Sequence, residues 1–468
     1  GGTYRFTIAS SIPIPYGYRS SGFPLAVVPG DTAEISVPEL QSGAKSWAVA
    51  VAGSGGSTFA VRASHRDDWT KSAPEAAFRE FEKHLAGKPF PEIMTGKSGL
   101  RASLRASQDI GSETDFYIPS YGSVATSTAY PGNRIRAKCL GISGSAYVYV
   151  DNSISNPSSS LISEVRLRFE EGIQPRIRDI FGEEPGVGPD GDSRLTILLT
   201  DSMSQGIAGI FYGADLFAND PGDIQLKESN GRKIFYLKYS LASEITRYGT
   251  MAHEFQHMVN FWQKRTVAGS GVFEETWLNE GMSKYAEEVC GYGILQGDEN
   301  TALLIKLSQE NFNNLSLTDW TGLNSYGVSY LFVRFLAQEN RYGTTYREVT
   351  RGLISSSLTG KANVEAITRE SFDQTLARWG ISLYLNNHTS TDPQQYGLQG
   401  LNLTGQFAGV TLPGFKAEVM NTGNQINVGL LPDGIRAFVR QSTGSALTEF
   451  ELTGFSSSMK IWLFDQRQ

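Results

Sequence analysis

The sequence is poor in cysteine and histidine and contains no long apolar run. Its two cysteines, Cys139 and Cys290, are too few for a disulfide framework, so they either form a single bridge or stay as two unpaired, buried thiols. We find no apolar run of about eighteen residues and therefore expect no transmembrane span. The net charge of −7 lacks the basic excess of nucleic-acid-binding proteins, so we expect no nucleic-acid partner.

The length and composition are those of a multidomain globular protein. The 468 residues leave room for about three domains of roughly 150 residues each. Fifty glycines, with abundant serine, threonine and asparagine, are typical of exported bacterial proteins. The sequence does not open with a charged segment and an apolar core, so we expect that any signal peptide has been removed or was never present. We expect a secreted, cell-surface or periplasmic protein.

Four regions can be distinguished along the chain. Residues 1–64 alternate short β-prone runs with glycine and proline clusters and predict a small β-sandwich-like domain. Residues 65–115 predict a helix from Pro74 to Leu85 followed by a polar linker. Residues 116–394 mix helical and strand patterns, and residues 395–468 return to β patterns. The predicted fold class is α+β, with a mixed core flanked by N- and C-terminal β domains.

The mixed region contains the clearest local predictions. The apolar run from Arg194 to Thr200 predicts a buried central strand, and Ala208–Gly213 predicts an edge strand. A helix that opens near Ser159 is expected to kink at Pro175. Further elements are predicted at residues 146–151 (strand), 247–263, 277–290, 327–339, 363–368 and 371–386 (helices), and 425–431, 435–440 and 459–464 (strands).

The predicted helix at Arg247–Gln263 carries the pattern H-E-x-x-H, formed by His253, Glu254 and His257. Residues four apart share one face of a helix with Cβ atoms roughly 5–6 Å apart, so both imidazoles can bind one zinc ion. Glu254 can then reach a water on the metal and act as general base. The same helix repeats apolar residues, which indicates that its other sides pack in a core. The motif predicts a catalytic Zn²⁺ site.

A catalytic zinc site usually takes three protein ligands and leaves one position for water. The predicted helix at 277–290 supplies Glu280 on its first turns, with Thr276 as the expected N-cap. Glu275 is the competing ligand. It lies at or before the helix start, whereas metal ligands need rigid elements, so Glu280 is preferred.

Glu287 lies two helical turns beyond Glu280 on the same face. Histidines that bind zinc usually donate their other N–H to a carboxylate or carbonyl. Glu287 is therefore a candidate partner for His253 or His257. The alternative is a solvated helix face, because charged residues surround it in the sequence.

The remaining metal-binding residue types have less context. Asp190-Gly-Asp192 before the central strand could hold calcium, but the later ligands of a calcium loop are missing, which favours a plain turn. His65, His84 and His388 lie in no motif and receive no role.

At Trp277-Leu-Asn-Glu-Gly281, together with H-E-x-x-H, the sequence resembles the gluzincin clan of zinc peptidases. Within the clan it resembles the hyicolysin family of secreted bacterial neutral metallopeptidases. Further motifs that match this family lie at residues 148–151, 181–182, 190–192 and 208–212. The resemblance thus covers roughly residues 135–345. The resemblance implies a core in which a mixed-sheet subdomain adjoins a helical subdomain. It also implies three zinc ligands and a catalytic base, which are His253, His257, Glu280 and Glu254.

Two departures separate the chain from other branches of the clan. Thermolysin-like enzymes carry an aspartate four residues after the liganding glutamate, where this chain has Lys284, which favours Glu287 as the partner acid. Aminopeptidases of the clan recognise a free amine through a G-x-M-E-N-type loop, which we do not find upstream of His253. The resemblance therefore implies an endopeptidase.

Related gluzincins carry a tyrosine at a helix start, and its hydroxyl donates to the oxyanion of the tetrahedral intermediate. Tyr326, with Ser329 in the following small position, fits that register better than Tyr330. The alternative is an aromatic residue that only packs at the helix start.

The sequence thus predicts a zinc-dependent endopeptidase that cleaves extracellular proteins or peptides. An extended substrate is expected to add to the edge strand at Gly209, Ile210 and Phe211 by β-augmentation. Two alternatives stay open: an aminopeptidase of the same clan, and a matrix- or glycan-binding surface protein with a vestigial metal site. The intact Glu254 counts against the second alternative.

Overall fold

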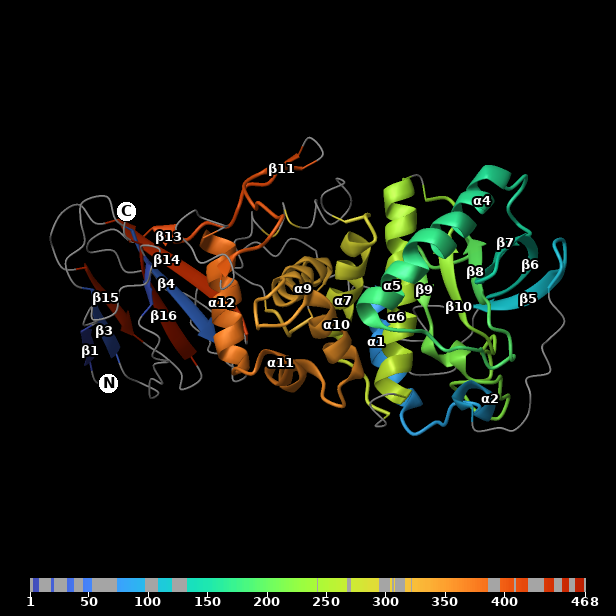
Figure 1. The fold of residues 1–468 in the computed structure, drawn as a ribbon, viewed down its shortest axis with the longest axis horizontal. Helices are drawn as coiled ribbons and strands as arrows, with labels where there is room; N and C mark the ends of the chain where they lie inside the picture. Colours follow the sequence, from blue (N-terminus) through green and yellow to red (C-terminus); the bar gives the residue numbers. More distant parts are fainter. Residues whose placement is uncertain are drawn as a thin grey trace. The chain divides into compact units, whose positions relative to one another are not determined.

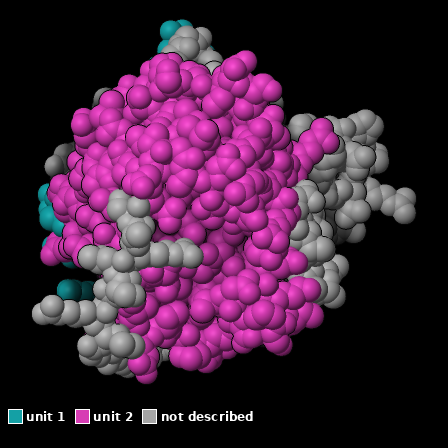
Figure 2. Space-filling model, turned by 90° about the vertical axis from the view of Figure 1, so that its right-hand side faces the viewer, with its two compact units in different colours: residues 1–71, 300–345, 368–468 teal, residues 72–299, 346–367 magenta. Residues whose placement is uncertain are grey.

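The structure is a computed structural model, and the residues that it describes fall into two compact units. Unit 1 comprises residues 1–71, 300–345 and 368–468, and unit 2 comprises residues 72–299 and 346–367 (Figures 1 and 2). The described residues are 74–96, 108–119, 133–241, 243–266, 271–293, 304, 307, 316–320, 322–385, 396–407, 410–419 and 433–441, with the strands at 3–7, 18–20, 32–37, 45–52, 448–453 and 459–466.

Unit 2 is built on a six-stranded mixed sheet. In sheet order the strands are β5 (Glu113–Ile118), β6 (Asn133–Ile142), β7 (Ala146–Asp151), β8 (Leu195–Thr200), β10 (Ile234–Lys238) and β9 (Gly209–Phe211). β7, β8 and β10 run parallel, whereas β5, β6 and β9 pair antiparallel with their neighbours. β7 and β8 are buried along their whole length, as parallel strands usually are, which explains their continuous apolar runs. The predicted central strand at β8 and edge strand at β9 are confirmed.

Helix α6 (Glu244–Thr266) packs against β9 and β10 on one side and against helix α7 (Thr276–Val289) on another (Figure 1). It confirms the helix predicted at 247–263 and extends three residues further at each end. A Cβ at Gly209 of β9 would lie only 2.9 Å from Cγ of Glu254. Glycine therefore allows the edge strand to approach the motif-bearing helix this closely.

Unit 2 contains several further helices. Helix α1 (Pro74–Glu82) continues into a 3₁₀ turn, confirming the helix predicted up to Leu85. The predicted linker contains the short helix α2 (Glu92–Thr95) and the start of β5. Helix α10 (Tyr346–Ser355), which the sequence did not predict, packs on α6, and helix α11 (Gly360–Thr368) follows it.

One long helical stretch covers the region predicted to kink at Pro175. It consists of α4 (Ser159–Leu167), a π-helical turn (Arg168–Ile173) and α5 (Gln174–Phe181). Ser158 caps α4 with its side-chain oxygen. The wider π-helical turn precedes Pro175, which falls in the first turn of α5, where its missing N–H is not needed. The interruption is therefore a π-helical turn just before the proline.

Unit 1 combines strands from both ends of the chain. Its five-stranded sheet has the order β13 (Glu418–Val419), β14 (Ile435–Gln441), β4 (Lys45–Ala52), β16 (Met459–Gln466) and β2 (Tyr18–Ser20). A second sheet contains β1 (Thr3–Thr7), β3 (Thr32–Val37) and β15 (Thr448–Thr453), and β11 (Gln406–Phe407) pairs with β12 (Val410–Thr411). β4 lies between two C-terminal strands, so the terminal β regions share their sheets. The strand predicted at 425–431 lies outside the described residues.

The fold class is α+β, as predicted, with a mixed sheet beside the helix that carries H-E-x-x-H. Helices α9 (Leu323–Leu336) and α12 (Phe372–Leu385) of unit 1 match two further predictions. Cys139 and Cys290 are both free, which excludes the single bridge, and burial raises their pKa values to about 11 and about 12. In the part of the chain that the structure describes, no helix is long and apolar enough to span a membrane.

Candidate active site

The two histidines of the motif lie side by side in the middle of α6. Their ring centroids are 4.6 Å apart and the rings are nearly perpendicular, at 81°. The side chains of His253, Glu254 and His257 are all buried. Glutamate is almost never fully buried in proteins unless it is paired. Burying these three groups is costly unless each is hydrogen-bonded or paired.

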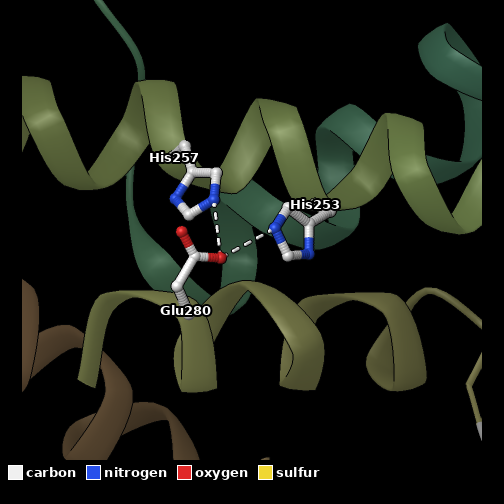
Figure 3. A group of neighbouring side chains, drawn as sticks. All are labelled: His253, His257 and Glu280. Atoms are coloured by element: carbon white, nitrogen blue, oxygen red, sulfur yellow. Dashed lines mark hydrogen bonds and ion pairs between the residues drawn. The ribbon is translucent and has the colours of Figure 1, made fainter. Parts of the chain in front are cut away.

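Helix α7 supplies the third member of the group, Glu280, whose side chain is fully buried. Its Oε2 atom lies 3.1 Å from Nε2 of His253 and 3.3 Å from Nε2 of His257, so both imidazoles point at one carboxylate oxygen (Figure 3). Among the described residues this is the one group of three metal-binding side chains whose ligand atoms come together, all within 4.8 Å of one another.

The donor set fits zinc. Two nitrogens and one carboxylate oxygen are ligands that zinc commonly takes, at about 2.0–2.2 Å in tetrahedral geometry. Tetrahedral ligands at such bond lengths are roughly 3.3 Å apart, close to the 3.1 and 3.3 Å between the Glu280 oxygen and the two imidazoles. Three protein ligands leave a fourth position for water, which is the arrangement of catalytic zinc sites.

The charges of the group also suit a cation. Burial opposes the charge on Glu280, but its hydrogen bonds with His253 and His257 and the charge of His253 outweigh burial and hold the carboxyl pKa well below its usual range. Burial and the charge of Arg79 lower the pKa of His257 to about 3, so its imidazole is neutral and keeps a lone pair. For His253, burial is outweighed by hydrogen bonds with Glu280 and Glu287, which raise its pKa to about 10. A metal ion that binds here would displace that proton.

Each imidazole is held from its other side. Nδ1 of His253 lies 2.8 Å from Oε1 of Glu287, and Nζ of Lys284 lies 2.9 Å from the same oxygen. Nδ1 of His257 lies 3.0 Å from Oδ1 of Asn279 and 2.9 Å from Oγ of Ser283. The contact of Glu287 with His253 is one of the two that the sequence offered, and its role toward a metal stays a prediction. The contacts of Lys284, Asn279 and Ser283 were not predicted. Glu287 is only 5% exposed, which argues against a solvated face.

Replacement of Glu287 by glutamine tests this support. Glutamine keeps an acceptor for His253 but removes the charge that Lys284 also contacts. We expect zinc affinity to fall by about 10–100-fold, the usual cost of losing a partner that orients a zinc-bound histidine. The measurement is competition with a chelator of known affinity. Glu288→Gln, the same change on the neighbouring, less buried residue, is the matched control, and equal losses in both variants would contradict a specific role for Glu287.

The edge strand touches the motif directly. The backbone N–H of Phe211 donates to Oε2 of Glu254 at 2.6 Å, and the Phe211 carbonyl accepts from Nη2 of Arg79 at 2.6 Å. Both backbone groups of Phe211 are thus engaged by side chains of unit 2. A peptide that pairs with the Phe211 N–H would compete with Glu254, whereas the carbonyl oxygen can accept a second hydrogen bond beside that from Arg79. The substrate-binding role of Gly209, Ile210 and Phe211 stays a prediction.

Tyr326 and Glu275 are the other two candidates. Tyr326 is in the first turn of α9 in unit 1, with its ring 4.8 Å from that of Trp320, and its role toward the group in unit 2 stays a prediction. Glu275 is the N-cap of α7, and its Oε2 accepts a hydrogen bond from Nε1 of Trp277. The expected N-cap, Thr276, is instead the first residue of α7, and its hydroxyl donates to Glu80.

The Asp190-Gly-Asp192 segment forms a turn, as preferred. Gly191 has a positive φ of 76°, and the backbone N–H of Asp192 donates to Oδ1 of Asp190. The carboxylate of Asp192 accepts hydrogen bonds from Tyr147 and from the backbone of Arg194. His84 is exposed, as expected of a surface histidine. The other two histidines without a motif, His65 and His388, lie outside the described residues.

Comparison with known proteins gives a partial similarity in sequence. No protein-family model matches the chain. The neutral metalloprotease ShpI of Staphylococcus hyicus is 26% identical over 232 residues, which cover 44% of this chain and 48% of that protein. The match therefore spans about half the length of this relative. This similarity is to a metalloprotease, and the resemblance to the hyicolysin family stays a prediction.

Solved structures give distant similarities. A two-domain M1 zinc metallopeptidase bound to L-arginine is 12% identical, with 75% of this chain and 63% of that chain covered and a TM-score of 0.32. An M1 zinc metallopeptidase from Deinococcus radiodurans is also 12% identical, with 75% and 62% covered and a TM-score of 0.29.

Proposed function

We propose that the chain is a zinc-dependent endopeptidase that hydrolyses peptide bonds of extracellular proteins. The observation that carries this proposal is the convergence of His253, His257 and Glu280 on one position, with Glu254 on the same helix between the two histidines. We propose these three residues as zinc ligands and Glu254 as the general base. The similarity to a neutral metalloprotease supports the same class.

The chemistry follows from the residues around this position. Zinc, when bound, supplies a Lewis acid that activates water and polarises the substrate carbonyl. Glu254 accepts the proton of the attacking water and returns it to the leaving amine. The Phe211 N–H fixes one oxygen of the Glu254 carboxylate at 2.6 Å, and we propose that the other oxygen carries the proton. Tyr326 is the proposed donor to the developing oxyanion.

Endopeptidase activity is proposed over aminopeptidase activity because the chain has no G-x-M-E-N-type sequence upstream of His253. A free-amine binding site therefore has no sequence support. The abundance of glycine and small polar residues favours a location outside the cytoplasm, in the secreted, cell-surface or periplasmic fraction.

A peptide with an acetylated N-terminus separates these activities. We expect cleavage at internal bonds of the blocked peptide, loss of cleavage on addition of a zinc chelator, and recovery when zinc is restored, because the Lewis acid is then removed and returned. The products are identified by mass spectrometry. The same peptide with a free N-terminus is the control.

Two outcomes would contradict the proposal. Stepwise shortening of the free peptide alone would show an aminopeptidase. If zinc-loaded protein cleaves neither peptide nor a casein substrate, the binding-protein alternative gains support.

A further inference from the structure

We propose that Arg79 on helix α1 is a positioning residue that holds the third ligand Glu280 and the edge strand in place for the zinc site. The inference rests on the zinc-binding part of the proposed function. It concerns a residue outside the H-E-x-x-H and Asn-Glu-Gly motifs, which lies in a helix that the sequence places before a polar linker.

Helix α1 buries charged residues where packing alone would favour apolar ones. Phe78 and Phe81 lie on its buried side and contact Tyr212, which follows β9, at ring centroid distances of 6.1 and 5.2 Å. These contacts already fix the helix against unit 2. Arg79 and Glu82 are nevertheless buried beside them, at 3% and 2% exposure. Apolar residues of similar volume often stabilise a core at least as well as such a pair, so packing alone does not account for the buried guanidinium.

The guanidinium of Arg79 lies at the oxygen of Glu280 that faces away from the histidines. Its Nε atom is 3.9 Å from Oε1 of Glu280, whereas the histidines face Oε2. Both atoms, Nε and Oε1, are buried, and neither has a hydrogen-bond partner in the described part of the chain. One carboxylate oxygen is therefore directed to the proposed zinc position and the other to Arg79. This division favours a carboxylate that binds zinc through a single oxygen.

Two more contacts connect Arg79 to the general base. Nη2 donates to the Phe211 carbonyl at 2.6 Å, and the Phe211 N–H donates to Glu254 at 2.6 Å. Nη1 lies 3.2 Å from Oε1 of Glu82 in the same helix. Arg79 thus joins the proposed ligand Glu280 and the proposed base Glu254 through one residue of the edge strand. A planar guanidinium can serve such separate acceptors at once, whereas an ammonium is a single point charge.

The test compares zinc affinity in three variants of the full chain. Arg79→Met/Glu82→Gln removes the guanidinium without leaving the Glu82 carboxylate buried opposite an apolar side chain. Glu82→Gln alone keeps Arg79 and is the matched control. We expect the double variant to bind zinc about 10–100-fold more weakly than the control, by chelator competition, as for other outer partners of zinc ligands. Arg79→Lys is expected to lie between the two. In turnover, kcat should fall while KM stays near the wild-type value, because Glu254 loses its orientation.

Several outcomes decide the proposal. The proposal is overturned if the double variant binds zinc as tightly as Glu82→Gln, or more tightly. It is also overturned if kcat/KM increases, because α1 would then obstruct the site. Circular dichroism of the metal-free proteins checks folding. If the double variant does not fold, Arg79→Lys decides, and wild-type zinc affinity in that variant overturns the proposal. If no protein cleaves peptide, the proposed peptidase function fails, while the zinc comparison still tests Arg79.

Discussion

Replacement of Glu254 by glutamine is expected to abolish peptide cleavage while zinc stays bound. General acid–base catalysis usually contributes about 10²–10⁴-fold to the rate, so kcat is expected to fall by at least this range. Glutamine keeps a side-chain oxygen that can accept the Phe211 N–H, which Glu254 now accepts at 2.6 Å. The substitution therefore removes the basic oxygen with little change in shape. Cleavage of the acetylated peptide and zinc content per chain are the two measurements.

The control for this experiment is another glutamate to glutamine change away from the proposed metal position. Glu288→Gln serves, because Glu288 lies on α7 but not in the metal-binding group. Full activity in a clean Glu254→Gln preparation would contradict the mechanism. Loss of zinc together with activity would instead mean that Glu254 supports the metal and does not act as the base.

Local features of the chain could be predicted well because they depend on neighbouring residues. The helix α6 follows from apolar residues at helical spacing, and the place of Glu287 two turns beyond Glu280 made it a candidate partner for either histidine. Strand β8 follows from its uninterrupted apolar run, which fits burial on both faces. For α6 and β8 the signal lies in the pattern of the element itself, whereas the histidine that Glu287 contacts depends on how two helices pack.

Features that depend on distant parts of the chain could not be predicted. Strand β6 escaped prediction because charged residues alternate along it, and Arg134 and Arg136 form ion pairs with β5. The pairing of β4 with β14 and β16 joins the two ends of the chain, and no local pattern specifies a partner. The only sequence clue to Arg79 is a charged residue beside the apolar stripe of its helix. The Phe211 carbonyl and the Glu280 carboxylate come close to Arg79 only in the tertiary fold.

Removal of the Glu280 carboxylate is expected to abolish stable zinc binding and, with it, activity. In Glu280→Ala only two protein ligands remain of the three that catalytic zinc sites use. The loss of affinity should exceed the roughly 10–100-fold typical of residues that only support a ligand. The variant also removes the carboxylate whose bonds raise the pKa of His253, so that pKa should fall from about 10. Zinc content after dialysis is the primary measurement.

Glu275→Ala is the matched control, because Glu275 is the other glutamate that the sequence offered as a ligand. In the structure its Oε2 bonds with Nε1 of Trp277 at 2.7 Å, and it does not belong to the group formed by His253, His257 and Glu280. We therefore expect Glu275→Ala to keep zinc. If Glu280→Ala retains zinc as well as the wild type and Glu275→Ala loses it, Glu275 and not Glu280 is the third ligand. Loss in Glu280→Ala alone would assign the third ligand to α7, where the helix holds the carboxylate rigidly against both imidazoles.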